Sequence, residues 1–101
     1  MNDSVADLHR ELQRRLHDIR TRASALSPLD IHSRMDAIRG AAGRGGLHAM
    51  EGLARLSSQL ALLPGCRVAT RACLDLAEDA LAARTPAEHQ AILAAVATRL
   101  H

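Results

Sequence analysis

The sequence of 101 residues contains no phenylalanine, tyrosine or tryptophan. It also contains no lysine, so all 13 residues of the lysine and arginine class are arginine. Without aromatic residues or β-branched runs, a β-sheet has little to build from. A surface that stacks nucleic-acid bases is also excluded. The apolar residues are mainly leucine, alanine, isoleucine, valine and methionine, which suit close packing between helices. The composition therefore predicts an all-α protein.

Three further features are missing. No apolar run approaches the roughly 20 residues of a membrane span. The formal charge is only +2, and arginine alternates with acidic residues, so there is no basic patch for nucleic acid. Cys66 and Cys73 lie about two helical turns apart and cannot bridge within one helix. We expect one domain over residues 1–101, soluble in the reducing cytoplasm, with no nucleic-acid or membrane partner.

Apolar residues recur at spacings of three and four along five segments, which predicts five helices. We expect helices from about residue 3 or 4 to 26, from 28 to the glycine run at 43–46, from 47 to 60, from about 67 to 83, and from 86 onward. Ser27-Pro28 and Thr85-Pro86 are typical helix starts. The stripes expected to face the core are Val5, Leu8, Leu12, Leu16, Ile19, Ala23 and Leu26; Ile31, Met35, Ile38 and Ala42; Leu47, Met50, Leu53, Ala54, Leu56 and Leu60; Val68, Ala72, Leu76 and Ala80; and Ile92, Val96 and Leu100. Short connections predict an antiparallel four-helix bundle with one additional flanking helix.

The stretch MDAIRGAAGRGGL, residues 35–47, is unusually rich in glycine for a helix. Glycine inside a helix costs about 1 kcal/mol relative to alanine. Gly45 and Gly46 are explained as a helix end. The periodicity places Gly40 and Gly43 on a face roughly opposite the core stripe, together with His32, Asp36 and Arg39. Gly40 would leave a shallow dent beside Asp36 for a partner; alternatively, these glycines let a neighbouring helix pack tightly.

Residues 36–56, DAIRGAAGRGGLHAMEGLARL, resemble the core motif of histidine-phosphotransfer (HPt) domains. That family reads His-x-Leu/Ile-Lys/Arg-Gly-Ser/Ala-Ala-Gly-x-x-Gly-Leu/Ala, followed by leucines at spacing three. The matching positions are Ile38, Arg39, Gly40, Ala41, Ala42, Gly43, Gly46 and Leu47, followed by Met50 and Leu53. The resemblance fades after about Leu60. It implies an HPt-like bundle of a bacterial two-component phosphorelay.

The resemblance also implies a partner, the receiver domain of a response regulator or hybrid histidine kinase. The docking residues that it implies are His32, Asp36, Arg39, Gly40, Gly43, Arg44 and His48. At the position of the family's phosphorylated histidine, this chain has Asp36. Aspartyl phosphates form where a divalent metal neutralises charge, and no acidic cluster surrounds Asp36. We therefore predict a domain that docks but carries no phosphate, with no enzymatic activity, metal or cofactor.

Alternatives remain. Asp36 could be an engineered replacement of histidine in an active transfer protein, and the domain itself would then be a relay. His32 or His48 could act as a displaced acceptor, and His32 with Asp36 would form half of a metal ligand set. His9, His17, His89 and His101 are expected on solvent faces. A rival of another class is a helical interaction or oligomerisation module, whose helix glycines seat a second copy.

Overall fold

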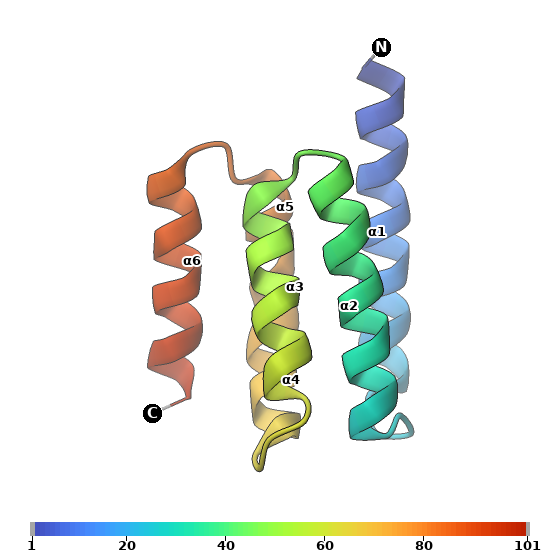
Figure 1. Ribbon diagram of the computed structural model, residues 1–101, viewed down its shortest axis with the longest axis vertical. Coiled ribbons are helices and arrows are strands. Elements are labelled where there is room, and N and C mark those ends of the chain that lie inside the picture. Colours follow the sequence, from blue (N-terminus) through green and yellow to red (C-terminus); the bar gives the residue numbers. More distant parts are fainter. Residues whose placement is uncertain (1, 101) are drawn as a thin grey trace.

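The computed structural model of the chain describes residues 2–100, with side chains from Ser4 onward, and these residues form α-helices and no strand (Figure 1). The helices are α1 (Asn2–Arg22), α2 (Pro28–Arg44), α3 (His48–Leu60), α4 (Cys66–Asp75), α5 (Ala77–Ala82) and α6 (Pro86–Arg99). The all-α prediction is confirmed, but the described residues form six helices where five were predicted. None of the helices in the described range is long and apolar enough to cross a membrane.

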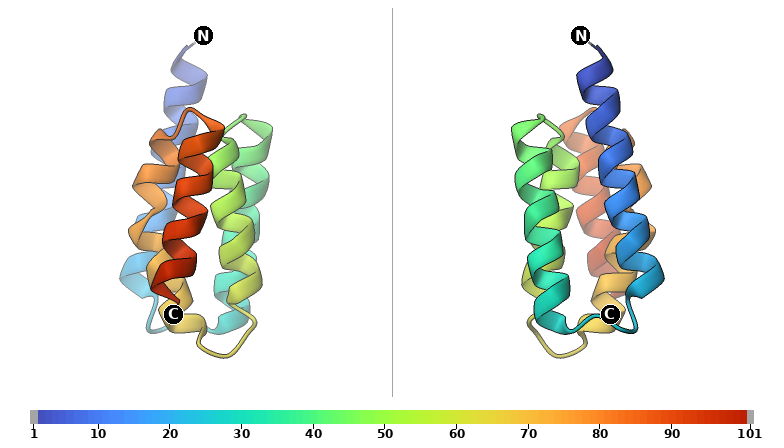
Figure 2. Two further views of the ribbon diagram at one scale, coloured as in Figure 1. Left: turned by 90° about the vertical axis from the view of Figure 1, so that its left-hand side faces the viewer. Right: turned by 90° about the vertical axis from the view of Figure 1, so that its right-hand side faces the viewer.

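The helices lie side by side, and α1, α2 and α3 run in alternating directions (Figure 1). The short helices α4 and α5 follow each other in one direction, and α6 returns. Around the molecule, α1 contacts α2, α2 contacts α3, α3 contacts both α4 and α5, and these two contact α1 again. Helix α6 packs against α3, α4 and α5 from outside this ring (Figure 2). The first turns of α1 project beyond the other helices.

Helix α2 begins and ends as its sequence predicts. The Ser27 Oγ accepts a hydrogen bond from the Asp30 amide at 3.1 Å, and the Asp30 carboxylate accepts one from the Ser27 amide at 3.2 Å. At the other end, Gly46 has a φ of 76° and the Leu47 amide donates to the Ala42 carbonyl at 2.9 Å. This is a Schellman motif, in which glycine takes the left-handed conformation. Two local signals thus fix the length of α2.

The core lies between the ring helices and contains most of the predicted apolar residues. Ile31, Met35, Ile38 and Leu53 are each only 1% exposed, as predicted. Other predicted core residues that are buried are Leu12, Leu16, Ile19, Leu26, Ala42, Met50, Ala54, Ala72, Leu76, Ala80, Ile92 and Val96. Leu8, Leu47 and Leu56 are half-buried at the edge of this core, and Ala23, just after the end of α1, is half-buried as well.

Four core predictions are wrong near helix ends, where the apolar stripe of one helix extends beyond the helices that pack against it. Val5 is 49% exposed because the first turns of α1 project past the other helices. Val68 is 62% exposed, since α4 instead buries the side that carries Ala69 and Thr70. Leu100 follows the end of α6 and is exposed, and Leu60, at the last turn of α3, is only half-buried.

The predicted helix over 67–83 is wrong as one piece, because it breaks between α4 and α5. Leu76 has φ −102° and ψ 0°, and its amide donates to the Cys73 carbonyl three residues back at 3.2 Å. Residues 72–74, 76 and 77 are all buried, a broader set than the apolar stripe of one surface helix. The break allows both short helices to bury these residues against α1 and α3.

Candidate functional site

The predicted row on α2 borders its seam with α3 and does not lie opposite the core. His32 is half-buried, and its Nδ1 lies 2.8 Å from the Ser58 carbonyl oxygen of α3. A carbonyl only accepts, so this contact requires a hydrogen on Nδ1. The predicted position opposite the core was wrong, because α3 packs along that side of α2 and meets His32 and Gly43. Side chains of both helices therefore form one surface.

Asp36 and Arg39 form an ion pair within one turn of α2. The Arg39 Nε donates to the Asp36 Oδ1 at 2.9 Å, and the two side chains are 50% and 35% exposed, respectively. The hydrogen bond and charge of Arg39 lower the pKa of the Asp36 carboxyl, and the pKa of the Arg39 guanidinium is raised in return. Asp36 is thus an accessible carboxylate at neutral pH, and its predicted exposure is confirmed.

The dent expected at Gly40 is covered by the side chain of Arg44, one turn later on the same helix. A methyl group placed on Gly40 would lie 3.2 Å from the Arg44 Nη1. The prediction of an open dent is therefore wrong for this structure. What covers it is the end of a long arginine side chain, which can swing away, since no ion pair or hydrogen bond in the described residues holds Arg44. The backbone at Gly40 is accessible once Arg44 moves.

Gly43 faces α3 and supports the packing alternative. A methyl group placed there would lie 2.6 Å from the Glu51 Oε2, so the glycine makes room for this carboxylate. Glu51 in turn lies near His48, with Oε1 3.8 Å from Nδ1, and near Arg55, with Oε2 3.7 Å from Nη2. Glu51 and Arg55 were missed from the sequence. Their spacing of four signals an ion pair on one helix, but nothing local places Glu51 over Gly43.

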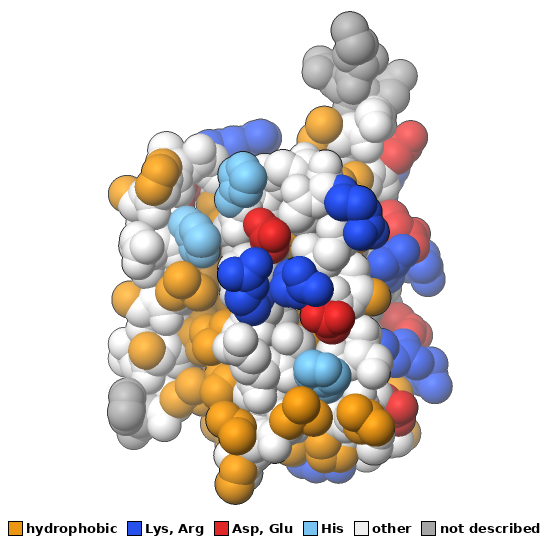
Figure 3. Space-filling view, viewed as in Figure 1, with side chains coloured by type: hydrophobic (Ala, Val, Ile, Leu, Met, Phe, Trp, Pro, Cys, Tyr) orange, Lys and Arg blue, Asp and Glu red, His pale blue; other side chains and the backbone are white. Residues whose placement is uncertain are grey.

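We call this combined surface the α2–α3 face. It comprises His32, Asp36, Arg39, Gly40, Gly43, Arg44, His48, Glu51 and Arg55. Figure 3 shows blue, red and pale blue side chains adjoining one another across α2 and α3, with apolar side chains toward α6 and the lower end. Three arginines and two acids are interspersed there. The face is a mosaic of both charge signs, and its ion pairs lie within single helices.

The chemistry available at the α2–α3 face is limited. The His48 side chain is 80% exposed and lies near the Glu51 carboxylate, while the His32 ring is held by Ser58. Residues 2–100 contain no group of three or more histidine, cysteine or acidic side chains that could hold a metal ion. Cys66 and Cys73 are free thiols, and burial raises the pKa of the Cys73 thiol to about 11. The face can present charge to a partner.

Two of the remaining four histidines, His9 and His89, differ from their expected positions. His17 is exposed, as expected. His89 is half-buried because α6 packs its imidazole against Gly52 of α3, and a methyl group on Gly52 would collide with it. His9 is also half-buried, and its Nε2 is shielded from solvent. His101 lies outside the described residues. The expectation of solvent faces is therefore wrong for His9 and His89.

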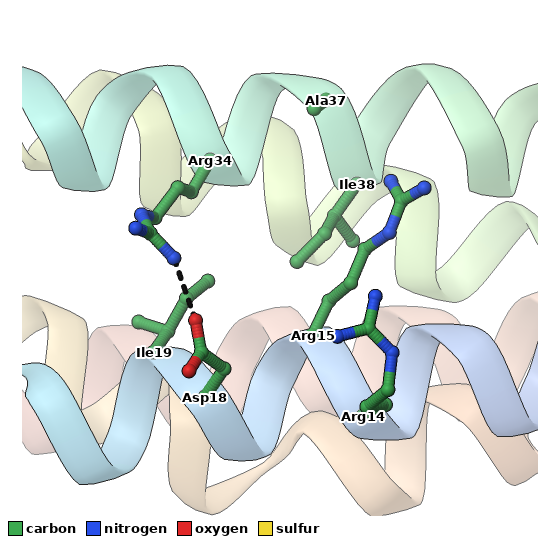
Figure 4. A pocket seen from close by; sticks show the side chains of 7 residues that line it. All are labelled: Arg14, Arg15, Asp18, Ile19, Arg34, Ala37 and Ile38. Atoms are coloured by element: carbon green, nitrogen blue, oxygen red, sulfur yellow. Dashed lines mark hydrogen bonds and ion pairs between the residues drawn. The ribbon is translucent and has the colours of Figure 1, made fainter.

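A groove of about 210 Å³ lies between α1 and α2, beside the α2–α3 face (Figure 4). Arg34 reaches across it and donates to the Asp18 Oδ2 at 2.7 Å. The other two arginines that line it, Arg14 and Arg15, both donate to Glu11 and hold the pKa of its carboxyl at about 2. Every cation of this groove is thus already paired with an acid.

No protein-family model matches the chain, and neither a curated protein nor a solved structure is significantly similar to it.

Proposed function

We propose that the chain is an HPt-like domain of a bacterial two-component phosphorelay and acts in the cytoplasm. In this proposal α1, α2, α3 and the α4–α5 pair make an antiparallel four-helix bundle, and α6 is the additional flanking helix. The order of contacts around the ring and the position of α6 outside it support this reading. The resemblance of residues 36–56 to the HPt core motif supports it independently, because that segment is the α2–α3 hairpin.

We further propose that the α2–α3 face docks the receiver domain of a response regulator or hybrid histidine kinase. The observation that carries this is Asp36, which is half-exposed on α2 at the position of the family's phosphoacceptor, one turn before Gly40. The mixed charges of the face suit a specific, orienting contact with a charged partner surface. Arg44 would leave Gly40 on docking, so that the partner approaches the backbone.

Phosphoryl transfer to Asp36 is disfavoured by the charges around it. The carboxylate is ionised, since Arg39 lowers its pKa, and it repels an incoming phosphoryl anion. A metal ion would have to screen this repulsion, and Asp36 has only His32 as a nearby second ligand. The domain would then act as a competitor or scaffold that binds receiver domains without accepting their phosphoryl group.

The alternative function is a helical interaction or oligomerisation module without a phosphorelay role. One observation favours it: four large apolar side chains are more than half exposed at the end of the molecule where α2 starts and α3 turns into α4. They are Leu29, Leu62, Leu63 and Val68. Self-association through this end predicts a dimer by light scattering that Leu63→Glu makes monomeric.

The test of docking is the affinity of the purified chain for a panel of receiver domains from its own genome, measured by interferometry. We expect binding to at least one receiver. Gly40→Arg should weaken it at least tenfold, because the added side chain fills the approach to the α2 backbone. The substitution displaces only the flexible end of Arg44, so the fold is retained.

Ala97→Arg is the matched control, since it adds the same side chain at an exposed position of α6. It should bind like the unmodified chain. Equal weakening by both variants would assign the effect to charge alone, and the α2–α3 face would not be the docking site. Absence of binding to every receiver would leave the interaction module as the better reading.

A further inference from the structure

A wide recess lies away from the α2–α3 face, between the end of α1, the start of α2 and one side of α4. Its volume is about 470 Å³, within the range of roughly 300–1,000 Å³ typical of small-molecule sites. We call it the α1–α4 cleft. Among the residues that line the cleft are Arg20, Ile31, Arg67, Thr70, Arg71, Leu74 and Asp75. It is more than twice as large as the groove of Figure 4.

Charge distinguishes this cleft from that groove. Arg20, Arg67 and Arg71 all line it, and Asp75 is the only acidic residue among its lining side chains. Asp75 is also shared, because its Oδ1 accepts from Arg20 and its Oδ2 accepts from Arg99, each at 3.1 Å. The cleft therefore keeps an excess of positive charge, whereas the arginines of the smaller groove are matched by acids.

Two of the three arginines are held in place and still have donors to spare. Arg20 is fixed by Asp75, and the Arg67 Nη1 donates to the Ala23 carbonyl at 3.1 Å. A guanidinium has five N–H donors, so each retains several for a ligand. Arg71 follows Arg67 by one turn on α4 and has neither an ion pair nor a hydrogen bond within residues 4–100. These donors are partly preorganised.

The floor of the cleft is apolar with one unsatisfied hydroxyl. Ile31 and Leu74 are 1% and 7% exposed and belong to the core. Thr70 is 3% exposed, and its Oγ1 has no hydrogen-bond partner in the described part of the chain. Leaving a buried hydroxyl without a partner costs about 1–3 kcal/mol. The Thr70 Oγ1 is itself covered, so a ligand body in the cleft meets the apolar lining and not this oxygen.

We propose that the α1–α4 cleft binds a small organic phosphate. Its phosphate is held by Arg71 and the spare donors of Arg67 and Arg20, because guanidinium groups bind phosphate through paired hydrogen bonds. Its apolar body lies against Ile31 and Leu74. The site uses α1 and α4, and it does not depend on receiver docking at the α2–α3 face.

The test is a titration followed by amide chemical shifts, with phenyl phosphate, inorganic phosphate and phenol as probes. Phenyl phosphate should bind saturably and shift the amides of residues 67–75. Inorganic phosphate should bind at the same residues but about tenfold more weakly, because it buries no apolar surface. Phenol should produce no saturable shift. This order separates a site for an organic phosphate from one that takes the free anion.

Arg71→Gln should weaken phenyl phosphate binding at least tenfold, since it removes a charged hydrogen bond. It should leave the fold unchanged, because Arg71 is exposed and unpaired in this structure. Arg84→Gln, which removes another exposed arginine from the connection between α5 and α6, is the matched control and should bind as the unmodified chain does. Equal binding by Arg71→Gln and the unmodified chain, shifts spread over the surface, or no saturation with phenyl phosphate would each overturn the proposal.

Discussion

The α2–α3 face and the α1–α4 cleft use the same residue types in different ways. On the face, Asp36 pairs with Arg39 one turn away on its own helix. At the cleft, Asp75 of α4 joins Arg20 of α1 to Arg99, the last residue of α6. Pairs within one helix can be changed without disturbing how helices pack, whereas pairs between helices contribute to the arrangement itself. Substitutions on the α2–α3 face should therefore change partner recognition with little effect on stability, whereas substitutions in the α1–α4 cleft should also affect how the helices pack.

The glycines offer the largest test of the difference between contacts within one helix and contacts between helices. Gly45 contacts Leu8 of α1, and a methyl group there would collide with the Leu8 side chain, whereas Gly40 is covered only by Arg44 of its own helix. Gly45→Ala should lower the free energy of unfolding by about 1–2 kcal/mol through overpacking. Gly40→Ala should raise it by up to about 1 kcal/mol through helix propensity. Urea denaturation measures both, and destabilisation of equal size would break the contrast.

The acidic residues give a smaller effect of the same kind. Asp75→Asn should lower the free energy of unfolding by about 1 kcal/mol, because two ion pairs between helices lose their charge. Asp36→Asn should change it by less than Asp75→Asn does, because its pair with Arg39 is exposed and lies within one helix. High salt should remove most of the difference between these variants, since the pairs are partly exposed. A larger loss from Asp36→Asn than from Asp75→Asn would contradict the assignment.

The smallest effect is expected at Glu11, whose partners Arg14 and Arg15 lie on its own helix. Their hydrogen bonds lower the pKa of Glu11 from 4.5 to about 2. Because the carboxylate is favoured in the folded state, its contribution to stability is present above pH 4.5 and is lost as the pH falls toward 2. An NMR titration should give a Glu11 pKa well below 4.5. Glu11→Gln should weaken the pH dependence of unfolding in that window.

The fold could be predicted where local chemistry determines it. Ser27 and Gly46 set the two ends of α2, because capping and a left-handed glycine act within a few residues. The break at Leu76 could not be predicted, since neither proline nor glycine marks it and its cause is burial against α1 and α3. The predicted burial of Val68, near the start of α4, was wrong for the same reason, because the exposure of such a residue depends on where the neighbouring helices end.

The candidate site was predictable in its α2 half only. The positions of Asp36 and Arg39 follow from helical periodicity, and their exposure follows with them. The part contributed by α3 depends on how two helices cross, so the contact of Glu51 with Gly43 carries no sequence signal. The α1–α4 cleft was not predicted at all. Its arginines are scattered along the chain, and only the packing of α4 against α1 gathers them.

Our central proposal is that the chain docks a receiver domain as an HPt-like protein would and accepts no phosphate from it. The most direct measurement incubates the unmodified chain and Asp36→His with a receiver domain that binds both and carries a labelled aspartyl phosphate. The account predicts that label appears on Asp36→His, because an exposed imidazole replaces the carboxylate, and that none is retained by the unmodified chain. Stable label on the unmodified chain, at Asp36, His32 or His48, would contradict it.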